Sequence, residues 1–383
     1  MKKILFNIPC FKNEELKAIN KLKKNSILSS NGFFTHYCSI WLKKNIKCKE
    51  ALLTHSCTAA LEMCAILLNV KKNDEIIMPS FTFVTTASAF VLRGGKPVYV
   101  DIDKDTCNID VLKFERAITK KTKAIVVVHY AGISCDMDII LKIAKKHNLY
   151  VVEDAAQALL STYKGKPLGS FGDLATLSFH ETKNIHCGQG GALLINNKKF
   201  IKRAKIIRDK GTNRDLFNKN LVRKYTWVDY GSSYALTEIN AAFLYSQFQR
   251  AKKTTNERVK IFETYHKFLK KLETKKLIKR PSVPDYAKHN GHIYYLIIKN
   301  NKRDKLIAYL KQKKISSVFH YLPLHSSPFG ILNSKKKFTL TNTDAISKNL
   351  LRLPMHNTLS KKDVVKCSNQ IHLFFKKNKT KKA

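Results

Sequence analysis

Asp154 and Lys183 are the residues of this chain whose types and setting are best suited to chemistry. Asp154 closes the apolar run LYVVED, and Lys183 lies in SFHETKN, just beyond another apolar run. Ligands of α/β sheets bind beyond the carboxyl ends of strands. A lysine amine forms Schiff bases with aldehydes, and a carboxylate keeps a pyridinium nitrogen protonated. The pair therefore predicts pyridoxal phosphate chemistry, in which the lysine also moves a proton as general acid and base.

Taken singly, each of these two residues has a simpler interpretation. An aspartate after a strand is more often the N-cap of a following helix. A lysine in a chain with 71 basic residues is most often a solvated surface residue. The hypothesis therefore depends on the pair, in this order and context.

A phosphate site is expected in THSCTAAL, where small hydroxyl residues precede a helix that starts near Ser56. Free N–H groups and the helix dipole attract anions at such a position. Ser178, in the segment of Lys183, is expected to be a second phosphate ligand. An ordinary capped helix start is an equally good interpretation of the segment by itself.

An apolar face for the cofactor ring is expected in PSFTFVTTASA, which offers Phe81 and Phe83 after a strand. Either ring could stack on a pyridine. For each phenylalanine alone, a place in the core is the more common outcome.

The elements that must position these residues form an α/β domain between about residues 50 and 200. Continuous apolar strands alternate with helical patterns there, which indicates a mostly parallel sheet covered on both faces. The expected strands include EIIMPSF, PVYVDID, TKAIVVVHY, LYVVEDAA, ATLSFHE and GGALLINN. After about residue 245 a long charged helix leads into a smaller α+β region. The predicted domains are residues 1–245, including an N-terminal arm, and residues 246–383.

Composition limits the other classes of function. The 383 residues are 44% hydrophobic, but no apolar run approaches the ~20 residues of a membrane span. The N-terminal apolar run breaks too early for a signal peptide, so a cytoplasmic protein is expected. Nine scattered cysteines without a CxxC pair favour free thiols over a metal site.

The net charge of +43 raises the alternative of a nucleic-acid-binding protein. The lysines occur in pairs along the whole chain and are not gathered on one helix or interleaved with aromatic residues. That distribution favours a generally lysine-rich surface over a nucleic-acid groove.

The motifs together resemble the DegT/DnrJ/EryC1/StrS family of pyridoxal-phosphate sugar aminotransferases. The resemblance runs from FNIPCF to RLPMHNTLS and rests on THSCTAALE, PSFTFVTTASAF, VYVDID, VVEDAAQA, SFHETKN followed by GQGG, GSSYALTEINAAF and VFHYLPLH. It implies the fold type I architecture of aspartate aminotransferase. That fold has a large domain with a mostly parallel seven-stranded sheet between helices and a smaller α+β C-terminal domain.

The resemblance also implies residue roles. Lys183 would carry the cofactor as a Schiff base, and Asp154 would pair with the pyridinium nitrogen. Gln157 would reach the 3′-oxygen side of the ring, and Phe83 would stack on it. The phosphate would be held by Thr58, the backbone of Ala59, and Ser178.

Family members act as homodimers with a shared active site, in which a segment like GSSYA reaches the phosphate of the neighbouring subunit. Ser233 and Ala235 stand there where the wider family often has Asn and Arg, and Gln189 stands in GQGG where it often has Glu. Ser233 is therefore the expected contribution to the partner's site.

Within the family, the likeness is greatest to members that make dTDP-4-amino-4,6-dideoxygalactose for enterobacterial common antigen. They move an amino group from L-glutamate to C4 of dTDP-4-dehydro-6-deoxy-D-glucose. Amination of another position, such as C3, or of another nucleotide sugar remains the nearest alternative.

Further polar residues are weaker candidates for contacts with the sugar nucleotide. His180 could face the substrate or pack in its loop. The segment FHYLPLH offers His320, Tyr321 and His325, which could line the sugar pocket or form a hydrogen-bonded turn around Pro323. In KGTNR, Lys210 or Arg214 could contact the diphosphate, although both suit a solvated surface equally well.

Overall fold

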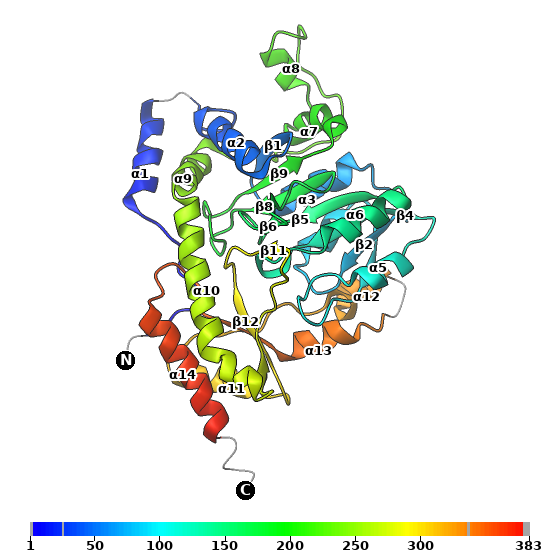
Figure 1. The fold of residues 1–383 in the computed structure, drawn as a ribbon. Coiled ribbons are helices and arrows are strands. Elements are labelled where there is room, and N and C mark those ends of the chain that lie inside the picture. Colours follow the sequence, from blue (N-terminus) through cyan, green and yellow to red (C-terminus); the bar gives the residue numbers. More distant parts are fainter. Residues whose placement is uncertain (1–2, 25–26, 335–337, 378–383) are drawn as a thin grey trace.

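A computed structural model describes residues 3–24, 27–334 and 338–377. Its centre is a seven-stranded sheet in the order β1-β9-β8-β5-β4-β2-β3 (Figure 1). Its strands are β1 (Glu50–Thr54), β2 (Glu75–Pro79), β3 (Lys96–Val100), β4 (Thr122–Val128), β5 (Tyr150–Asp154), β8 (Leu174–Ser178) and β9 (Gly191–Ile195).

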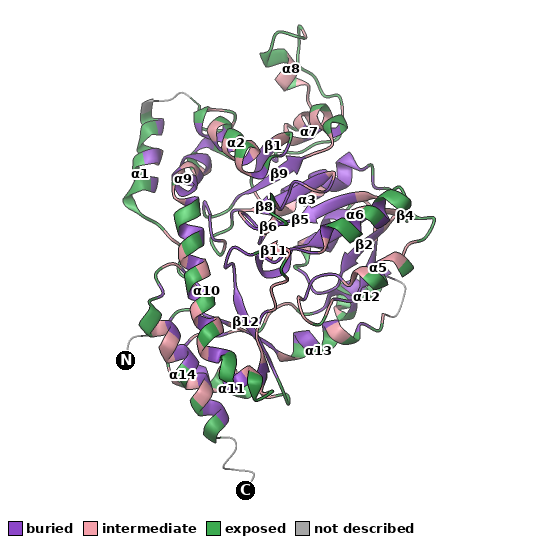
Figure 2. Ribbon diagram, in the orientation of Figure 1, coloured by how far each residue is buried: buried purple, intermediate pink, exposed green. Residues whose placement is uncertain are grey.

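The sheet is mostly parallel, as the sequence predicts. Strands β3, β2, β4, β5 and β8 pair in parallel, while β9 runs antiparallel to both β8 and β1. The five residues 124–128 of β4 are all buried, which is typical of a strand covered on both faces. Figure 2 shows the strands of this sheet as a buried layer, with exposed residues on the outer sides of the surrounding helices.

Helix α6 is amphipathic and buries one stripe of apolar residues. In α6 the buried residues Met137, Ile140, Ile143 and Ala144 recur at helical spacing, and Asp136 caps the helix through the Ile139 N–H. The other helices of this region are α2 (Phe33–Ile46), α3 (Cys57–Leu67), α4 (Thr85–Val91), α5 (Val111–Arg116), α6 (Met137–Lys146), α7 (Ile201–Arg208), α8 (Arg214–Asn218) and α9 (Glu238–Gln249). Helix α1 (Asn13–Asn20) packs on α9.

The long helix α10 (Ala251–Thr274) leads from α9 to a second sheet of order β10-β12-β13 (Figure 1). Its strands are antiparallel: β10 (Ile278–Lys279), β12 (Tyr294–Ile298) and β13 (Leu350–Leu353). The remaining helices are α11 (Arg303–Gln312), α12 (Pro328–Ser334), α13 (Thr341–Asn349) and α14 (Lys361–Lys377). Short 3₁₀ helices are η1 (Lys21–Lys24), η2 (Tyr130–Gly132), η3 (Lys198–Phe200) and η4 (Leu324–Ser326).

Several contacts cross the proposed boundary near residue 245, among them backbone pairings. A small third sheet pairs β11 (Ala287–Lys288) with β6 (Thr162–Tyr163), which in turn pairs with β7 (Lys166–Pro167). The N-terminal segment bridges Ile4 to Ile315, and Ile4 packs in the apolar cluster of the C-terminal region. The two-domain division stays a prediction, and the first described residues lie against the C-terminal part.

Within the described ranges, no helix combines the length and apolarity needed to cross a bilayer. The same ranges contain no group of three or more His, Cys, Asp or Glu side chains arranged to hold a metal ion.

Candidate active site

A cavity of about 700 Å³ lies where the carboxyl ends of β5 and β8 meet the start of α3. Residues 319–322 and β13 complete its wall from the C-terminal part of the chain. Of the residues predicted from sequence, this cavity brings together Thr58, Phe83, Asp154, Gln157, Ser178, His180, Lys183, His320 and Tyr321.

Asp154 is the last residue of β5, and its carboxylate is fixed from both sides. The Thr86 hydroxyl donates to Oδ2 at 2.7 Å, and the Ala156 N–H donates to Oδ1 at 3.2 Å. Burial raises the pKa of Asp154, while the Thr86 hydroxyl, the Ala156 N–H and the charge of Lys183 act in the opposite direction. The carboxylate therefore has a fixed orientation and one close basic neighbour in the cavity.

Lys183 follows β8 in a tight turn, in which its N–H donates to the His180 carbonyl at 2.8 Å. Burial lowers the pKa of Lys183, and the nearby Cys57 and Asp154 oppose that shift. A lowered pKa makes the neutral, nucleophilic amine more accessible than that of a surface lysine. The structure therefore separates Lys183 from the solvated lysines that dominate this chain.

The start of α3 has the features of an anion site. Ser56 is the N-cap, and its Oγ accepts the Ala59 N–H at 3.0 Å. Ser56, Thr58 and Ser178 all line the cavity. The helix has eleven residues, so its first turn presents free N–H groups and the positive end of the dipole toward the cavity.

Gly191 of the GQGG segment explains how β9 comes so close to this helix start. A Cβ built on Gly191 would lie 2.4 Å from the Cys57 nitrogen, which is too close for any side chain. Glycine is therefore required where the sheet edge meets the first turn of α3.

The two phenylalanines of PSFTF have different surroundings. Phe81 is 1% exposed and packs among Tyr130, His320 and Tyr321, so it is a core residue. Phe83 is 55% exposed and lines the cavity, with its ring centroid 6.3 Å from that of Tyr321. Phe83 is thus the ring of the pair with a face available to a ligand.

Gln157 and Tyr321 form one polar group at the cavity wall. Gln157 Oε1 accepts the Ala131 N–H at 2.7 Å, and its Nε2 donates to the Tyr321 hydroxyl at 2.8 Å. His320 Nδ1 lies 2.7 Å from the Tyr130 hydroxyl. Burial lowers the pKa of His320, which keeps the ring neutral.

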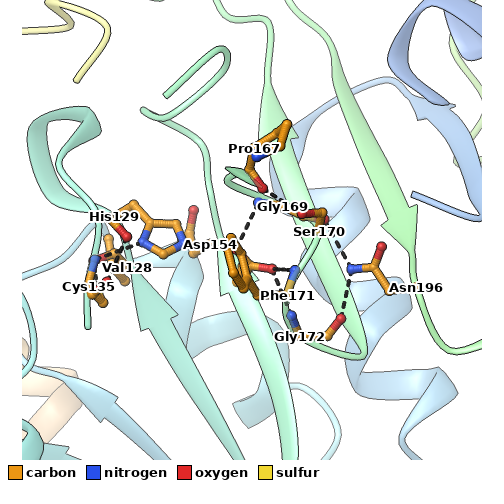
Figure 3. Close-up of polar contacts among 12 residues, drawn as sticks. Val128, His129, Cys135, Asp154, Pro167, Gly169, Ser170, Phe171, Gly172 and Asn196 are labelled. Carbon is orange, nitrogen blue, oxygen red and sulfur yellow. Dashed lines mark hydrogen bonds and ion pairs between the residues drawn. The ribbon is translucent and has the colours of Figure 1, made fainter. Parts of the chain in front are cut away.

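A buried hydrogen-bond network supports the strand that carries Asp154 (Figure 3). The carboxylate of the neighbouring Glu153 is hydrogen-bonded to His129 Nε2 at 3.0 Å. It also accepts hydrogen bonds from the backbone N–H groups of Gly169, Phe171 and Gly172, at 2.7, 2.7 and 2.8 Å. Burial alone would raise the pKa of Glu153, but these donors outweigh it and lower that pKa. The His129 N–H also donates to the Asp154 carbonyl at 3.2 Å. The network therefore ties β4, β5 and the turn before β8 together beneath the site.

Five further predicted residues do not line this cavity. His325 is buried with its Nδ1 2.7 Å from the Ser80 hydroxyl, so the turn interpretation describes it and the sugar-pocket role is not supported. The Ala59 N–H is bound by Ser56, since it serves the helix cap. Ser233 is exposed and bridges to Asp209, outside the cavity of its own chain. Lys210 and Arg214 are also absent from the cavity wall and are solvent-exposed.

Several lining residues were not among those predicted for the site. Arg352 is the first residue of RLPMHNTLS and lies on β13, in a segment whose apolar residues predict only a strand. Phe6, Cys57 and His292 also line the cavity. Burial raises the pKa of the Cys57 thiol to about 12, so it stays protonated at neutral pH.

The residues present fit pyridoxal phosphate. The cavity contains an amine suited to an aldehyde, a fixed buried carboxylate suited to a ring nitrogen, and an anion site at the start of a helix. Its volume also leaves room for a second, polar ligand beside the cofactor.

Relatives and solved structures agree with this geometry. An uncharacterized protein of Methanocaldococcus jannaschii is 35% identical, covering 97% of each chain. Spore coat polysaccharide biosynthesis protein SpsC of Bacillus subtilis is 30% identical, covering 94% of each chain. A putative sugar aminotransferase of Streptococcus pneumoniae, solved in a PMP form, has a TM-score of 0.88 at 27% identity, covering 96% of this chain and 98% of that one. Helicobacter pylori PseC, an aminotransferase of pseudoaminic acid biosynthesis, has a TM-score of 0.88 at 25% identity, covering 98% of this chain and 100% of that one.

The fold is that of the pyridoxal-phosphate-dependent aminotransferases, and pyridoxal phosphate is the cofactor. The family model covers residues 9–372, which is nearly the whole chain. The chain belongs to the DegT/DnrJ/EryC1/StrS aminotransferase family.

Proposed function

We propose that this protein transfers the amino group of L-glutamate to C4 of dTDP-4-dehydro-6-deoxy-D-glucose. The products are dTDP-4-amino-4,6-dideoxy-D-galactose and 2-oxoglutarate. The observation that carries aminotransfer is the presence of Lys183 and Asp154 in one cavity, at the ends of neighbouring parallel strands. The choice of sugar and donor rests on the resemblance of the sequence motifs.

Bound pyridoxal phosphate supplies an electron-accepting ring that stabilises negative charge at the carbon losing a proton. Asp154, whose two oxygens are oriented by Thr86 and Ala156, would keep the ring nitrogen protonated. Lys183 Nζ takes the proton from Cα of glutamate and in the second half-reaction delivers a proton to C4 of the sugar. Burial lowers its pKa, so this amine is less strongly held in the protonated form than a surface lysine is.

Other residues of the chain would bind and orient the reactants. Thr58 and Ser178, which line the cavity, would hold the cofactor phosphate with the first turn of α3. Phe83 would cover one face of the ring. Gln157 and Tyr321, already hydrogen-bonded to each other, lie on the polar edge that the ring oxygen would meet.

The sugar would enter past His180, His320 and Tyr321, which line the cavity. If the Tyr130 hydroxyl donates to Nδ1 of His320, the proton of this neutral ring lies on Nε2. His320 then presents a hydrogen-bond donor suited to a sugar hydroxyl or keto oxygen.

A cytoplasmic homodimer would complete the site. Ser233 is exposed and lies outside its own cavity, which agrees with a role at the partner subunit's cofactor phosphate. Size-exclusion chromatography with light scattering would test the dimer.

The position of amination is tested with purified protein, L-glutamate and two substrates, the 4-keto and the 3-keto dTDP-6-deoxy sugars. NMR of the product identifies which carbon bears nitrogen. Amination of the 4-keto sugar with an axial C4 amine supports the proposal. Turnover of the 3-keto sugar alone would replace it with the C3 alternative.

A further inference from the structure

Asn184, the residue after Lys183, has a buried side chain that no step described so far uses. It is 5% exposed, its NH₂ donates to the Asn290 carbonyl at 2.9 Å, and its Oδ1 lies 3.0 Å from Nδ1 of His292. Both partners lie more than a hundred residues further along the chain, just before β12. The turn that carries Lys183 is therefore held by the C-terminal part of the protein.

These contacts define which nitrogen of His292 carries its proton. A carbonyl can only accept a hydrogen bond, so the NH₂ of Asn184 must face Asn290, and its Oδ1 must face His292. Nδ1 of His292 is therefore protonated and donates to Asn184. Burial lowers the pKa of His292 well below its ordinary 6.5, and the surrounding basic groups lower that pKa further: Lys183, Arg258, Arg352 and His320. His292 is thus a neutral ring with a defined donor toward Asn184.

The segment that holds Asn184 has a fixed position of its own. Arg258 is buried on α10, and its guanidinium donates to the Gly291 carbonyl at 3.1 Å and to the His292 carbonyl at 2.6 Å. A planar guanidinium that binds two successive carbonyls defines the orientation of both peptide groups. Asn290 and His292 therefore offer Asn184 partners whose positions are set independently of the loop of Lys183.

Asn290 connects the same segment to the strand end that carries Asp154. Its Nδ2 donates to the carbonyls of Gln157 and Leu159, both at 2.9 Å. Gln157 follows Asp154 in the chain and lines the cavity with it. One residue therefore spans the two segments whose side chains, Asp154 and Lys183, must meet the same ligand.

The placement of the Lys183 amine depends on how firmly its backbone is held. The amine lies at the end of a flexible four-carbon stem, so a loose backbone would add further freedom to its position. On one side, the Lys183 N–H closes the turn at the His180 carbonyl. On the other side, Asn184 is the contact that ties this turn to His292, a residue of the cavity wall.

We propose that Asn184, held by Asn290 and by Nδ1 of His292, is a positioning residue for Lys183. The inference rests on the proposed function, in which Lys183 Nζ moves the proton at the reacting carbon. A misplacement of about 1 Å can slow a reaction by about 10²-fold, so loss of this contact should slow proton transfer more than it weakens binding. His292 acts through its contact with Asn184 and not by binding a reactant.

Competitive acetylation of the apoprotein tests the proposal without cofactor or substrate. Labelling with acetic anhydride across pH, followed by mass spectrometry of the peptide that contains Lys183, gives the pKa of this amine. The native midpoint should lie below the ordinary 10.5, because the amine is buried. In N184A the turn is released and water reaches the amine, so the midpoint should move toward 10.5. The other groups that act on this pKa stay in place: Cys57, Asp154 and Arg352.

Two variants of His292 separate the roles of its two nitrogens. H292N keeps an NH₂ group near the position of Nδ1, whereas H292Q places its amide near the position of Nε2 and loses the donor to Asn184. H292N should therefore keep a midpoint close to the native one, and H292Q should shift it as N184A does. The opposite order would place the role of His292 at its other nitrogen and would overturn the assignment.

The holoenzyme gives a second readout, which a merely structural role would not move. N184A should lower kcat of the donor half-reaction by about 10–100-fold and change the KM of L-glutamate by less than about threefold. The kinetic isotope effect with L-glutamate deuterated at Cα should rise, because proton transfer becomes the slower step.

N196A is the matched control. Asn196 is half-buried and also makes two hydrogen bonds, from its NH₂ to the carbonyls of Gly169 and Gly172. It follows β9 at the end of that strand away from the cavity. N196A should lower thermal stability and leave the acetylation midpoint and the isotope effect at their native values. Thermal unfolding checks each variant, and H292Q serves if N184A does not fold.

A native midpoint and a native isotope effect in N184A would overturn the inference. The acetylation needs neither sugar nor amino acid, so its result is independent of the reactants chosen above. A native holoprotein in which borohydride attaches no cofactor to Lys183 would instead defeat the proposed function itself.

Discussion

Asp154 and Lys183 reach one cavity from two adjacent strands. Asp154 ends β5, and Lys183 follows β8, which pairs with β5 in parallel. Parallel pairing places both strand ends at the same edge of the sheet, so residues far apart in sequence face one ligand. Each also shifts the pKa of the other toward its charged form, against the effect of burial.

Asp154→Asn tests the role of the carboxylate. The amide keeps the shape of the side chain but cannot hold the ring nitrogen protonated, so kcat should fall by about 10²–10⁴-fold. The donor half-reaction, followed by stopped-flow absorbance with L-glutamate, measures it. Asp110→Asn, at the half-buried N-cap of α5, is the control and should retain native rates, because Asn caps helices as well as Asp does.

The lowered pKa of Lys183 has a consequence for cofactor loading. Only the neutral amine attacks an aldehyde, so loading of the apoprotein should quicken with pH and level off below the ordinary lysine value of 10.5. Because Asp154 raises the pKa of Lys183, Asp154→Asn should move the midpoint lower still. Absorbance kinetics across pH measure the midpoint, and a value at or above 10.5 would contradict a desolvated amine.

Glu153→Gln tests the network beneath the site. Each carboxylate oxygen of Glu153 accepts hydrogen bonds from two N–H groups. In the Gln variant, the side-chain NH₂ replaces one of these oxygens and cannot accept from the two N–H groups that it faces. Urea unfolding at neutral pH should show a loss of about 3 kcal/mol. Glu14→Gln, on the exposed face of α1, should change little.

The Glu153 carboxylate also predicts how the stability of the folded protein changes at acid pH. The folded-state pKa of Glu153 lies below its ordinary 4.5, so its contribution to stability is present above pH 4.5. That contribution is lost as pH falls through the folded-state pKa. The Gln variant should therefore lose less stability than the native protein on acidification below pH 4.5, and an identical slope would argue against the lowered pKa.

Much of this architecture is predictable because local patterns dictate it. The apolar runs that end at Asp154 and Ser178 are buried strands, and Ser56 begins the helix predicted there. The antiparallel direction of β9 is not predictable in this way, because an apolar run reads the same in either direction.

Gly191→Ala tests the close approach of β9 to α3. The added Cβ would lie 2.4 Å from the Cys57 nitrogen and push back the first turn of the helix. Pyridoxal phosphate should bind the apoprotein about 5- to 100-fold more weakly, as expected for overpacking of about 1–3 kcal/mol. Gly165→Ala adds a Cβ that meets nothing within 4 Å; it strains a backbone with φ of +78° and so costs stability, but it should leave the affinity unchanged. Equal affinities in both variants would exclude this account of the phosphate site.

The positions of the C-terminal residues relative to the cavity cannot be predicted from local sequence patterns. His325 lies four residues from Tyr321 but turns toward Ser80, because a 3₁₀ turn, η4, begins after Pro323. Arg352 enters the cavity only because β13 pairs with β12, a contact between segments about fifty residues apart. Such tertiary pairings place side chains that no local spacing can place.

The most direct test of the account is chemical labelling at Lys183. Holoprotein treated with borohydride and digested should yield one peptide, containing Lys183, that carries the reduced cofactor. Lys183→Ala should give no labelled peptide and no transfer of nitrogen from glutamate to a keto sugar. A label on a different lysine, or measurable turnover by the alanine variant, would contradict the central claim.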